Sequence, residues 1–397
     1  AMAYVEHRII HDADSHLMEL ADSLDDFLDP KFRAAYDELP KLKAWPRDGK
    51  WVTHARALHE DPAFRAGDAE NLLTRKNYEA LGSFRRNDRP LALDQLGFAS
   101  QLIFTTWCLG NFGLDESNNP DLAYATAQAH NRMMTWFCSV DRRMLATAYI
   151  PLADFERAKK VAREAIDLGA KALLIPSRCP KGHSPSHVAF DPIWAMAQEA
   201  GLPIVFHVGG EVKMNPNYFE NGMPRVKDFH GGEENFTSLS FMTIPHSVME
   251  TMAALIFDGV LDRFPKLKFG AIELGGSWLP SWMRYLDAGY AAFFKHEERL
   301  KKLSMKPSEF VKRQIRVTPY PHEDSGWIIA NSGEEICLFS SDFPHVEGGR
   351  NPLKRFSESL TGISPRAIER FYCDNFIDLM GEGLAPDLRR PAHLAAA

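Results

Sequence analysis

Short apolar runs alternate with stretches of helical periodicity along most of the chain. From Pro90 onward, each run is of the buried-strand type, and the stretch that follows it repeats apolar residues at helical spacing. Gly169 and Gly201 mark helix ends, and Asn119 followed by Pro120 marks a helix start. This pattern predicts strands near residues 10, 102, 146, 172, 205, 270, 316 and 338.

Alternation of strands and helices is typical of a parallel sheet with helical crossovers. The chain has no G-x-G-x-x-G pattern after its first strand, which disfavours a doubly wound dinucleotide-binding sheet. With eight strand–helix units, we expect an α/β fold of the (β/α)8 TIM-barrel type. We expect residues 1–397 to form one domain.

The stretch from Leu20 to Arg89 departs from this rhythm. It is mixed in character, and Pro30, Pro40 and Pro62 break its helical pieces into short lengths. We interpret residues 20–89 as a long insertion after strand 1 that caps the site, since insertions of this size often cover active sites. A partly ordered surface excursion is the alternative.

Composition excludes several classes of protein. The 397 residues are 45% hydrophobic and 25% charged, with a net charge of -7, so neither nucleic acid nor an anionic membrane is expected as a partner. The apolar runs fall short of the ~20 residues that cross a bilayer, and the first residues show no apolar signal region. Five scattered cysteines suggest free thiols, and we expect a cytoplasmic protein.

Candidate chemistry lies at the ends of the expected strands. Asp14 and His16 end the first strand on one face, His207 ends the fifth, Glu273 follows the sixth and Asp342 follows the eighth. Each residue alone could be a polar strand end or a helix cap. In a barrel, however, all five point into the same mouth, where active sites are built.

Two imidazoles and several carboxylates around one point suit a divalent ion such as Zn, Mn or Fe. The larger number of carboxylates favours Mn²⁺ or Fe²⁺ over Zn²⁺. Two further histidines are candidates for contact with substrate: His345, three residues after Asp342, and His230, in a glycine-rich loop. Arg178, after the fourth strand, could meet an anionic group, whereas Glu19 is expected to be a solvated loop residue.

Several motifs together resemble the amidohydrolase superfamily, in its amidohydrolase-related branch of the aminocarboxymuconate-semialdehyde decarboxylase type. They are Asp12-Ala-Asp-Ser-His16, Ile204-Val-Phe-His207, Ile256-Phe-Asp-Gly-Val-Leu-Asp-Arg-Phe-Pro265, Glu273-Leu-Gly-Gly-Ser-Trp278 and Ser340-Ser-Asp-Phe-Pro-His345. The resemblance implies one divalent metal ion held by Asp14, His16, His207 and Asp342. It also implies a homodimer. The chain departs from many relatives in having Asp14 and Glu273 where they have histidine.

The resemblance and the site together favour a metal-dependent enzyme that decarboxylates a small aromatic or muconate-like organic acid without oxidation. Asp342, Glu273, His345 and His230 are the expected catalytic residues. Hydrolysis of an amide, ester, lactone or C–C bond needs the same ligands and is the alternative. A dinuclear Fe/Mn oxygenase and a non-catalytic scaffold subunit are two further alternatives.

Overall fold

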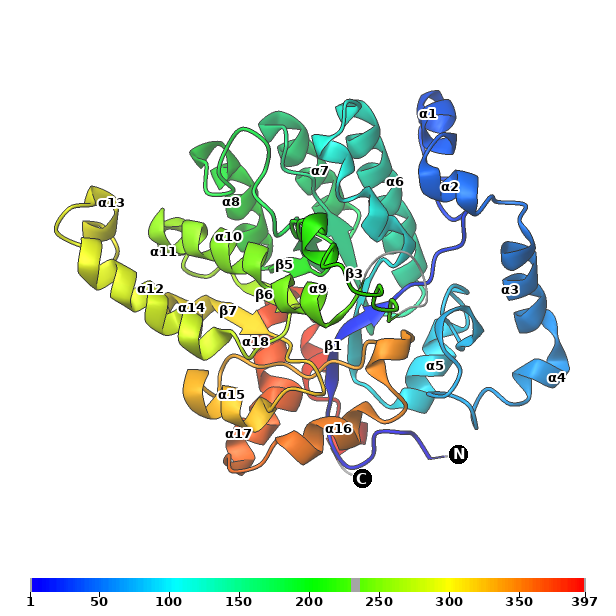
Figure 1. Cartoon of the computed structure of the whole chain (residues 1–397). Helices are drawn as coiled ribbons and strands as arrows, with labels where there is room; N and C mark the ends of the chain where they lie inside the picture. The colour runs from blue at the N-terminus through cyan, green and yellow to red at the C-terminus, as the bar shows by residue number, and fades with distance from the viewer. Residues whose placement is uncertain (1, 230–235, 396–397) are drawn as a thin grey trace.

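A curled parallel sheet forms the centre of the molecule. The computed structural model describes residues 2–229 and 236–395. Within them, seven parallel strands are paired in chain order, and helices surround the sheet (Figure 1). The strands are β1 (His11–His16), β2 (Ser100–Phe104), β3 (Met144–Tyr149), β4 (Ala172–Leu174), β5 (Ile204–His207), β6 (Phe269–Ile272) and β7 (Ile315–Val317). Neighbouring strands joined by helical crossovers confirm a TIM-like α/β fold.

The helices after β1 follow the expected rhythm. They are α5 (Arg89–Leu96), α6 (Pro120–Cys138), α7 (Phe155–Asp167), α8 (Asp191–Ala200), α9 (Ser238–Thr243), α10 (His246–Phe257), α11 (Val260–Arg263), α12 (Leu279–Phe293), α13 (Glu298–Lys301), α14 (Pro307–Gln314), α15 (Ser325–Ser332), α16 (Pro352–Ser359), α17 (Pro365–Glu369), α18 (Asn375–Met380), α19 (Pro386–Arg389) and α20 (Ala392–Ala395). The predicted cap is present, because the Asn119 side chain accepts a hydrogen bond from the Leu122 N–H at 3.1 Å. Gly201 ends α8 with a φ of 69°.

The prediction of an eighth regular strand is wrong. Cys337 forms an isolated bridge with Val317, and Phe343 forms another with Ser15, so the segment between them lies against both β7 and β1. Asp342 has a φ of 53°, which takes the backbone out of the extended conformation that a ladder requires. The segment therefore contacts both edges of the sheet without becoming a strand, and we call residues 337–345 the β7–β1 bridging segment.

A long connection, residues 17–88, joins β1 to α5, and we call it the β1–α5 segment. Its short elements are η1 (Pro30–Phe32), α1 (Arg33–Asp37), α2 (Pro40–Ala44), α3 (Lys50–Glu60), α4 (Pro62–Arg65) and η2 (Asn77–Glu79). Pro30, Pro40 and Pro62 begin helices here, because the first turn of a helix needs no proline N–H. The segment is thus more regular than its prolines suggested.

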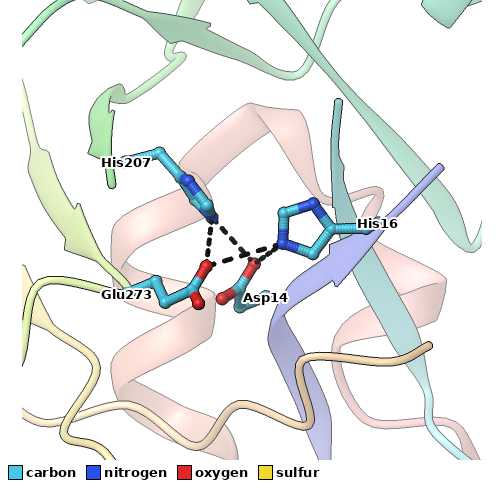
Figure 2. A group of neighbouring side chains, drawn as sticks. All are labelled: Asp14, His16, His207 and Glu273. Atoms are coloured by element: carbon cyan, nitrogen blue, oxygen red, sulfur yellow. Dashed lines mark hydrogen bonds and ion pairs between the residues drawn. The ribbon is translucent and has the colours of Figure 1, made fainter. Parts of the chain in front are cut away.

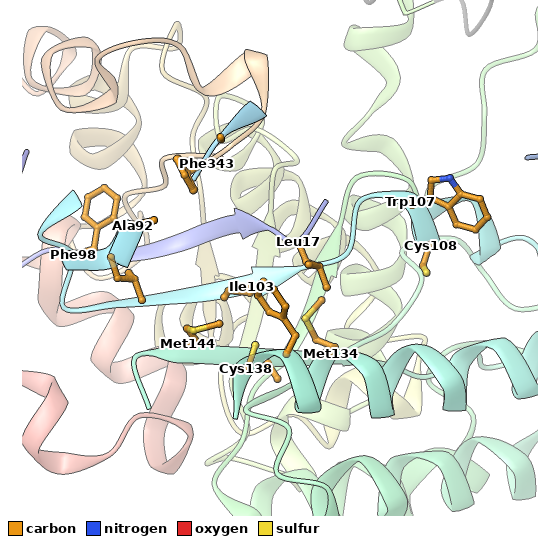
Figure 3. Close-up of a cluster of buried hydrophobic side chains, with 14 of the residues drawn as sticks. Leu17, Ala92, Phe98, Ile103, Trp107, Cys108, Met134, Cys138, Met144 and Phe343 are labelled. Atoms are coloured by element: carbon orange, nitrogen blue, oxygen red, sulfur yellow. The ribbon is translucent and has the colours of Figure 1, made fainter. Parts of the chain in front are cut away.

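Apolar side chains from the β1–β2 side of the sheet and from α6 form one part of the core (Figure 3). Ile103 on β2 and Met144 on β3 belong to the same buried cluster as Met134 and Cys138 on α6. Burying each large side chain of this kind contributes about 1.5–3 kcal/mol. This packing fixes β1 and β2, whose carboxyl ends carry part of the site. All five cysteines are free, as expected.

The stretch Ser238–Phe257 departs from the expectation that no apolar run reaches membrane-spanning length. Of the helices in the described part of the chain, it alone has the length and hydropathy of a membrane span, and 39% of that window is buried. The structure breaks it at Pro245 into α9 and α10. Val248, Met252 and Ile256 of α10 are buried in the protein core, which also accounts for the apolar character.

Candidate metal centre

Four strand-end residues and their neighbours converge at one end of the sheet. Alternate residues of β1 place Asp14 and His16 on the same side, and both side chains are buried. His207 is the last residue of β5, and its register partner is Ile272 on β6. Glu273 therefore follows directly beside His207, and the side chains of Asp14, His16, His207 and Glu273 point toward one another (Figure 2).

The distances identify His16 as the hub of the cluster. His16 Nε2 lies 3.2 Å from Asp14 Oδ1, 3.3 Å from Asp342 Oδ1 and 3.7 Å from Glu273 Oε2. His207 Nε2 lies 3.3 Å from Asp14 Oδ1 and 3.1 Å from Glu273 Oε2. Asp14, His16, His207 and Glu273 offer ligand atoms within 4.8 Å of one another, and so do His16, Glu273, Asp342 and His345.

Backbone carbonyls fix the orientation of both imidazoles. His16 Nδ1 lies 2.9 Å from the Thr105 carbonyl oxygen, and His207 Nδ1 lies 2.9 Å from that of Val208. A carbonyl only accepts, so both Nδ1 atoms carry hydrogen and donate. In the neutral rings, both Nε2 atoms then present a lone pair to the carboxylates, which is the arrangement of metal-binding histidines.

Two buried polar atoms in the cluster test whether a cation would fit. Among the described residues, neither His16 Nε2 nor Asp342 Oδ1 has a hydrogen-bond partner, although they lie 3.3 Å apart. Buried polar atoms without partners are costly and rare in native proteins. A divalent ion would bind both atoms. The cluster therefore has the ligand types of a metal site and lone pairs that are free to bind a metal.

Charges within the cluster support one another. Burial disfavours the charge on Asp14, yet His207 and His16 hold the pKa of Asp14 below its ordinary value. Burial likewise opposes the positive charge on His207, but Asp14 and Glu273 raise the pKa of His207 to about 10. Asp14 also raises the pKa of His16 well above its usual value, against the effect of burial. Without a cation, the imidazoles themselves supply the positive charge.

These shifts predict that metal binding releases protons. At pH 7 the raised pKa values keep His16 and His207 protonated in the metal-free protein, whereas a ligand Nε2 must be free of its proton, so about two protons per chain should leave. Affinity should consequently fall as the pH falls. Calorimetric titration with Mn²⁺ in buffers of different ionisation enthalpy measures how many protons each chain releases when it binds the metal. Release of none would contradict a role for these imidazoles as ligands.

Comparison with known proteins places the chain in a family. The family model described as Amidohydrolase matches residues 96–379, most of the chain. The chain belongs to the amidohydrolase family. It is therefore a metal-dependent enzyme of this superfamily. His207, Glu273 and Asp342 fall inside the matched region, whereas Asp14 and His16 precede it. A search of curated proteins finds no match.

Solved structures share the amidohydrolase fold with this chain. An amidohydrolase from Mycobacterium avium subsp. paratuberculosis K-10 is 22% identical with a TM-score of 0.72, covering 95% of this chain and 100% of that one. A 5-carboxyvanillate decarboxylase from Novosphingobium aromaticivorans, complexed with manganese and 4-hydroxy-3-methoxy-5-nitrobenzoic acid, is 18% identical with a TM-score of 0.58, covering 94% and 96%. A dihydroxybenzoic acid decarboxylase from Polaromonas, with bound manganese and 2-nitroresorcinol, is 15% identical with a TM-score of 0.56, covering 95% and 99%.

The β2–α6 loop of this amidohydrolase reaches the site through His345. His345 Nδ1 lies 3.0 Å from Asp342 Oδ1, its Nε2 lies 2.9 Å from the Thr106 hydroxyl, and its ring stacks on His16 at 3.8 Å. Glu19 in turn accepts hydrogen bonds from the N–H groups of Thr106 and Trp107. The expectation that Glu19 is solvated is wrong: it is 1% exposed and anchors this loop. Its nearness to His16 in sequence was the available signal.

A buried hydrogen-bond network holds together the backbone segments that carry the candidate metal ligands. Asp12 accepts hydrogen bonds from the Ser341 N–H at 2.8 Å, the Ser341 hydroxyl at 2.5 Å and Gln101 Nε2 at 2.8 Å. Burial raises the pKa of Asp12 to about 7 in spite of these donors. Arg89 donates to Gln101 Oε1 at 3.1 Å and to the His16 carbonyl oxygen at 2.8 Å. The network ties β1 to β2 and to the β7–β1 bridging segment.

Left-handed backbone occurs at two acids of the site. Glu273 has a φ of 54° and Asp342 a φ of 53°, a region that residues other than glycine rarely adopt. The Glu273 backbone is held on both sides, since its N–H donates to the Thr318 hydroxyl at 2.8 Å and its carbonyl accepts from the Tyr320 hydroxyl at 2.7 Å. Such conformations persist where surrounding contacts enforce them, often at functional sites.

The other candidates differ in outcome. His230 lies outside the described residues, so its expected catalytic role stays a prediction. Arg178 donates to the Phe112 carbonyl oxygen and lies 3.4 Å from Glu116 Oε1, so its charge is already paired within the protein. Asp342 and Glu273 lie in the cluster itself, and His345 lies at its edge. The structure thus brings Asp14, His16, His207, Glu273, Asp342 and His345 into two overlapping groups that share His16 and Glu273, and it leaves Arg178 outside them.

Proposed function

We propose that this amidohydrolase is a metal-dependent, non-oxidative decarboxylase, a carbon–carbon lyase. The observation that carries the proposal is the position of Glu273, a third acid 3.1 Å from His207 Nε2 within a cluster already supplied with Asp14 and Asp342. A decarboxylase needs ligands for a cation and, separately, an acid that protonates carbon. With Asp14, His16, His207 and Asp342 as the ligands, Glu273 is the acid that remains to protonate carbon.

Asp14, His16, His207 and Asp342 would hold one divalent ion, Zn, Mn or Fe. When bound, such an ion supplies positive charge against the substrate carboxylate and against the negative charge that develops as CO2 leaves. The balance of two imidazoles and two carboxylates favours Mn²⁺ or Fe²⁺ over Zn²⁺. Manganese in the decarboxylases from Novosphingobium and Polaromonas supports this choice.

Glu273 would carry the proton. Cleavage of the C–C bond leaves its electron pair on the former α-carbon, and the Glu273 carboxyl gives that carbon a proton and then recovers one from water. Burial alone would raise the pKa of Glu273, but His16 and His207 outweigh it and hold that pKa below its ordinary value. His345 and Thr106 would keep Asp342 in place.

The substrate in this proposal is a small aromatic or muconate-like organic acid. Tyr320, which holds Glu273, stacks on His322 at 5.4 Å, so these two rings would offer an aromatic surface beside the cluster to such a substrate. We propose that the β1–α5 segment caps this space. The homodimer and the cytoplasmic location stay predictions.

Hydrolysis is the second candidate. The same ligands would lower the pKa of a bound water, and Asp342 or Glu273 would take its proton. The family description and the contact of both carboxylates with His16 favour this alternative specifically. An oxygenase would need two redox metal ions per chain, and a scaffold would need none, so elemental analysis separates both from the two leading candidates.

The test is a substrate screen on protein purified without added metal and then loaded with Mn²⁺, Fe²⁺ or Zn²⁺. Carboxylated aromatic acids such as 5-carboxyvanillate and 2,6-dihydroxybenzoate are supplied, and CO2 and the decarboxylated product are measured. We expect CO2 in equal amount to the product, and loss of turnover in Glu273→Gln with metal content retained. Release of an amine or alcohol from amide or ester substrates, without CO2, would favour hydrolysis instead.

A further inference from the structure

Lys76 lies in a part of the β1–α5 segment that is tied to both ligand-bearing loops. The Asn77 N–H donates to the Pro344 carbonyl oxygen at 2.9 Å, two residues beyond Asp342. The Tyr78 hydroxyl donates to the Glu19 carbonyl oxygen at 2.9 Å, three residues beyond His16. This part of the segment therefore lies across the carboxyl ends of the strands, on the same face as the candidate metal centre.

The ammonium of Lys76 is held against the loop that follows Asp342. Lys76 Nζ donates to the Gly349 carbonyl oxygen at 2.6 Å. The neighbouring Gly348 is pressed onto the bridging segment, since a Cβ there would lie 2.1 Å from the Ser341 carbonyl oxygen and 3.4 Å from the Asp342 carbonyl carbon. The half-buried Lys76 ammonium thus lies against the loop that follows Asp342, and the Asp342 carboxylate is the acid that acts on its charge most strongly.

No carboxylate pairs with this charge. Across residues 2–229 and 236–395, no acid lies within ion-pair distance of the Lys76 ammonium. Most arginines of the same segment behave differently: six of the seven form an ion pair with an aspartate, and Arg86 instead donates to Ser139. The six are Arg33, Arg47, Arg56, Arg65, Arg75 and Arg85. An ammonium has three donors, and only one is used here.

A purely structural role accounts poorly for this arrangement. Burial lowers the pKa of Lys76, while Asp342 and Glu347 oppose that effect, so the charge loses solvent and gains only one neutral acceptor. An anionic group bound at the two remaining Lys76 donors would compensate for this lost solvation.

We propose that Lys76 binds a second anionic group of the substrate, remote from the carboxylate that meets the metal ligands. This inference rests on the proposed function and narrows its substrate to a small aromatic acid with two anionic groups. The metal-facing group is removed as CO2, and the remote group stays on the product and fixes the orientation of the ring. Lys76 is a specificity-determining residue in this arrangement.

Two probes separate the remote anion from the metal-facing group. The first, 4-hydroxy-3-methoxy-5-nitrobenzoic acid, carries a carboxylate besides its nitro group. The second, 2-nitroresorcinol, carries none. We expect Lys76→Gln in the Mn²⁺-loaded full chain to weaken binding of the first probe about 10- to 100-fold, the size of a lost charge-assisted contact. Binding of 2-nitroresorcinol should change by less than about twofold, and Lys76→Arg should restore part of the loss.

The control is Lys50→Gln, an exposed lysine on α3 of the same segment, which should bind both probes as the unmodified protein does. Metal content and thermal unfolding of each variant show whether the fold and the centre are intact. Equal weakening of both probes, no weakening of the first, or failure of the unmodified protein to bind it would overturn the proposal. Binding needs no turnover, so a failed CO2 screen together with the expected probe selectivity would reject decarboxylation but keep the anion site.

Discussion

His16→Ala should lose both bound metal and activity. His16 is the hub of the cluster: its Nε2 lies within 3.7 Å of oxygens from Asp14, Glu273 and Asp342, and no other histidine in the described part of the chain reaches all three. Loss of even an outer partner of a metal ligand lowers affinity about 10- to 100-fold, so loss of the hub should exceed about 100-fold. Elemental analysis after purification without added metal measures the occupancy.

The matched control is His54→Ala, which removes an exposed imidazole on α3 and should retain metal. His16→Gln keeps the volume and the polarity of the side chain, so it serves if the alanine variant does not fold. One metal ion per chain in both His16 variants, with turnover at the level of the unmodified protein, would show that the metal site lies elsewhere.

Arg89→Met should destabilise the fold by about 3–5 kcal/mol, the cost of breaking a buried charged network by removing one partner. The Arg89 side chain is fully buried and donates to the carbonyl oxygens of His16 and Gly82 and to Gln101. Burial lowers its pKa to about 10, so it remains charged at pH 7 and balances Asp12. Methionine fills a similar space but leaves these acceptors without their donor and removes the positive charge that balances Asp12. Urea unfolding measures the change.

Arg142→Met is the comparison for this variant, because Arg142 pairs with Asp387 on the surface, where both side chains are about two-thirds exposed. Such surface pairs contribute about 0–1 kcal/mol. If Arg89→Met unfolds at the same urea concentration as Arg142→Met, then the buried network does not support the β1 end of the site.

Hydrophobic periodicity was sufficient to predict most of the architecture. Strands β1 to β7 and helices such as α6 and α7 lie where apolar spacing and caps placed them, because these elements are specified by local patterns. The site was predictable for the same reason. Parallel strands end at one edge of a sheet, so polar residues at strand ends had to converge, and Asp14, His16 and His207 did so.

Features that depend on contacts distant in sequence were not predictable. The apolar run before Asp342 resembles a strand, but a left-handed residue and single bridges on either side keep it irregular. Glu19 is buried because N–H groups of the β2–α6 loop bind it. Its nearness to His16 pointed to the site, but its local sequence does not show these distant donors. The position of the Lys76 ammonium likewise depends on its hydrogen bond to a carbonyl oxygen 273 residues away in the sequence.

The left-handed backbone at Glu273 and Asp342 restricts how these two positions can diverge over evolution. β-branched residues fit this conformation badly, whereas aspartate, asparagine, histidine and glycine adopt it most readily. Substitutions that this backbone tolerates are therefore mostly to aspartate, asparagine or histidine. Each of these side chains has an oxygen or nitrogen atom that can bind a cation, whereas glycine has none. At Glu273 an exchange for histidine would even relieve strain. Lineages of this fold could thus exchange acids and bases at the centre while they keep a metal site throughout.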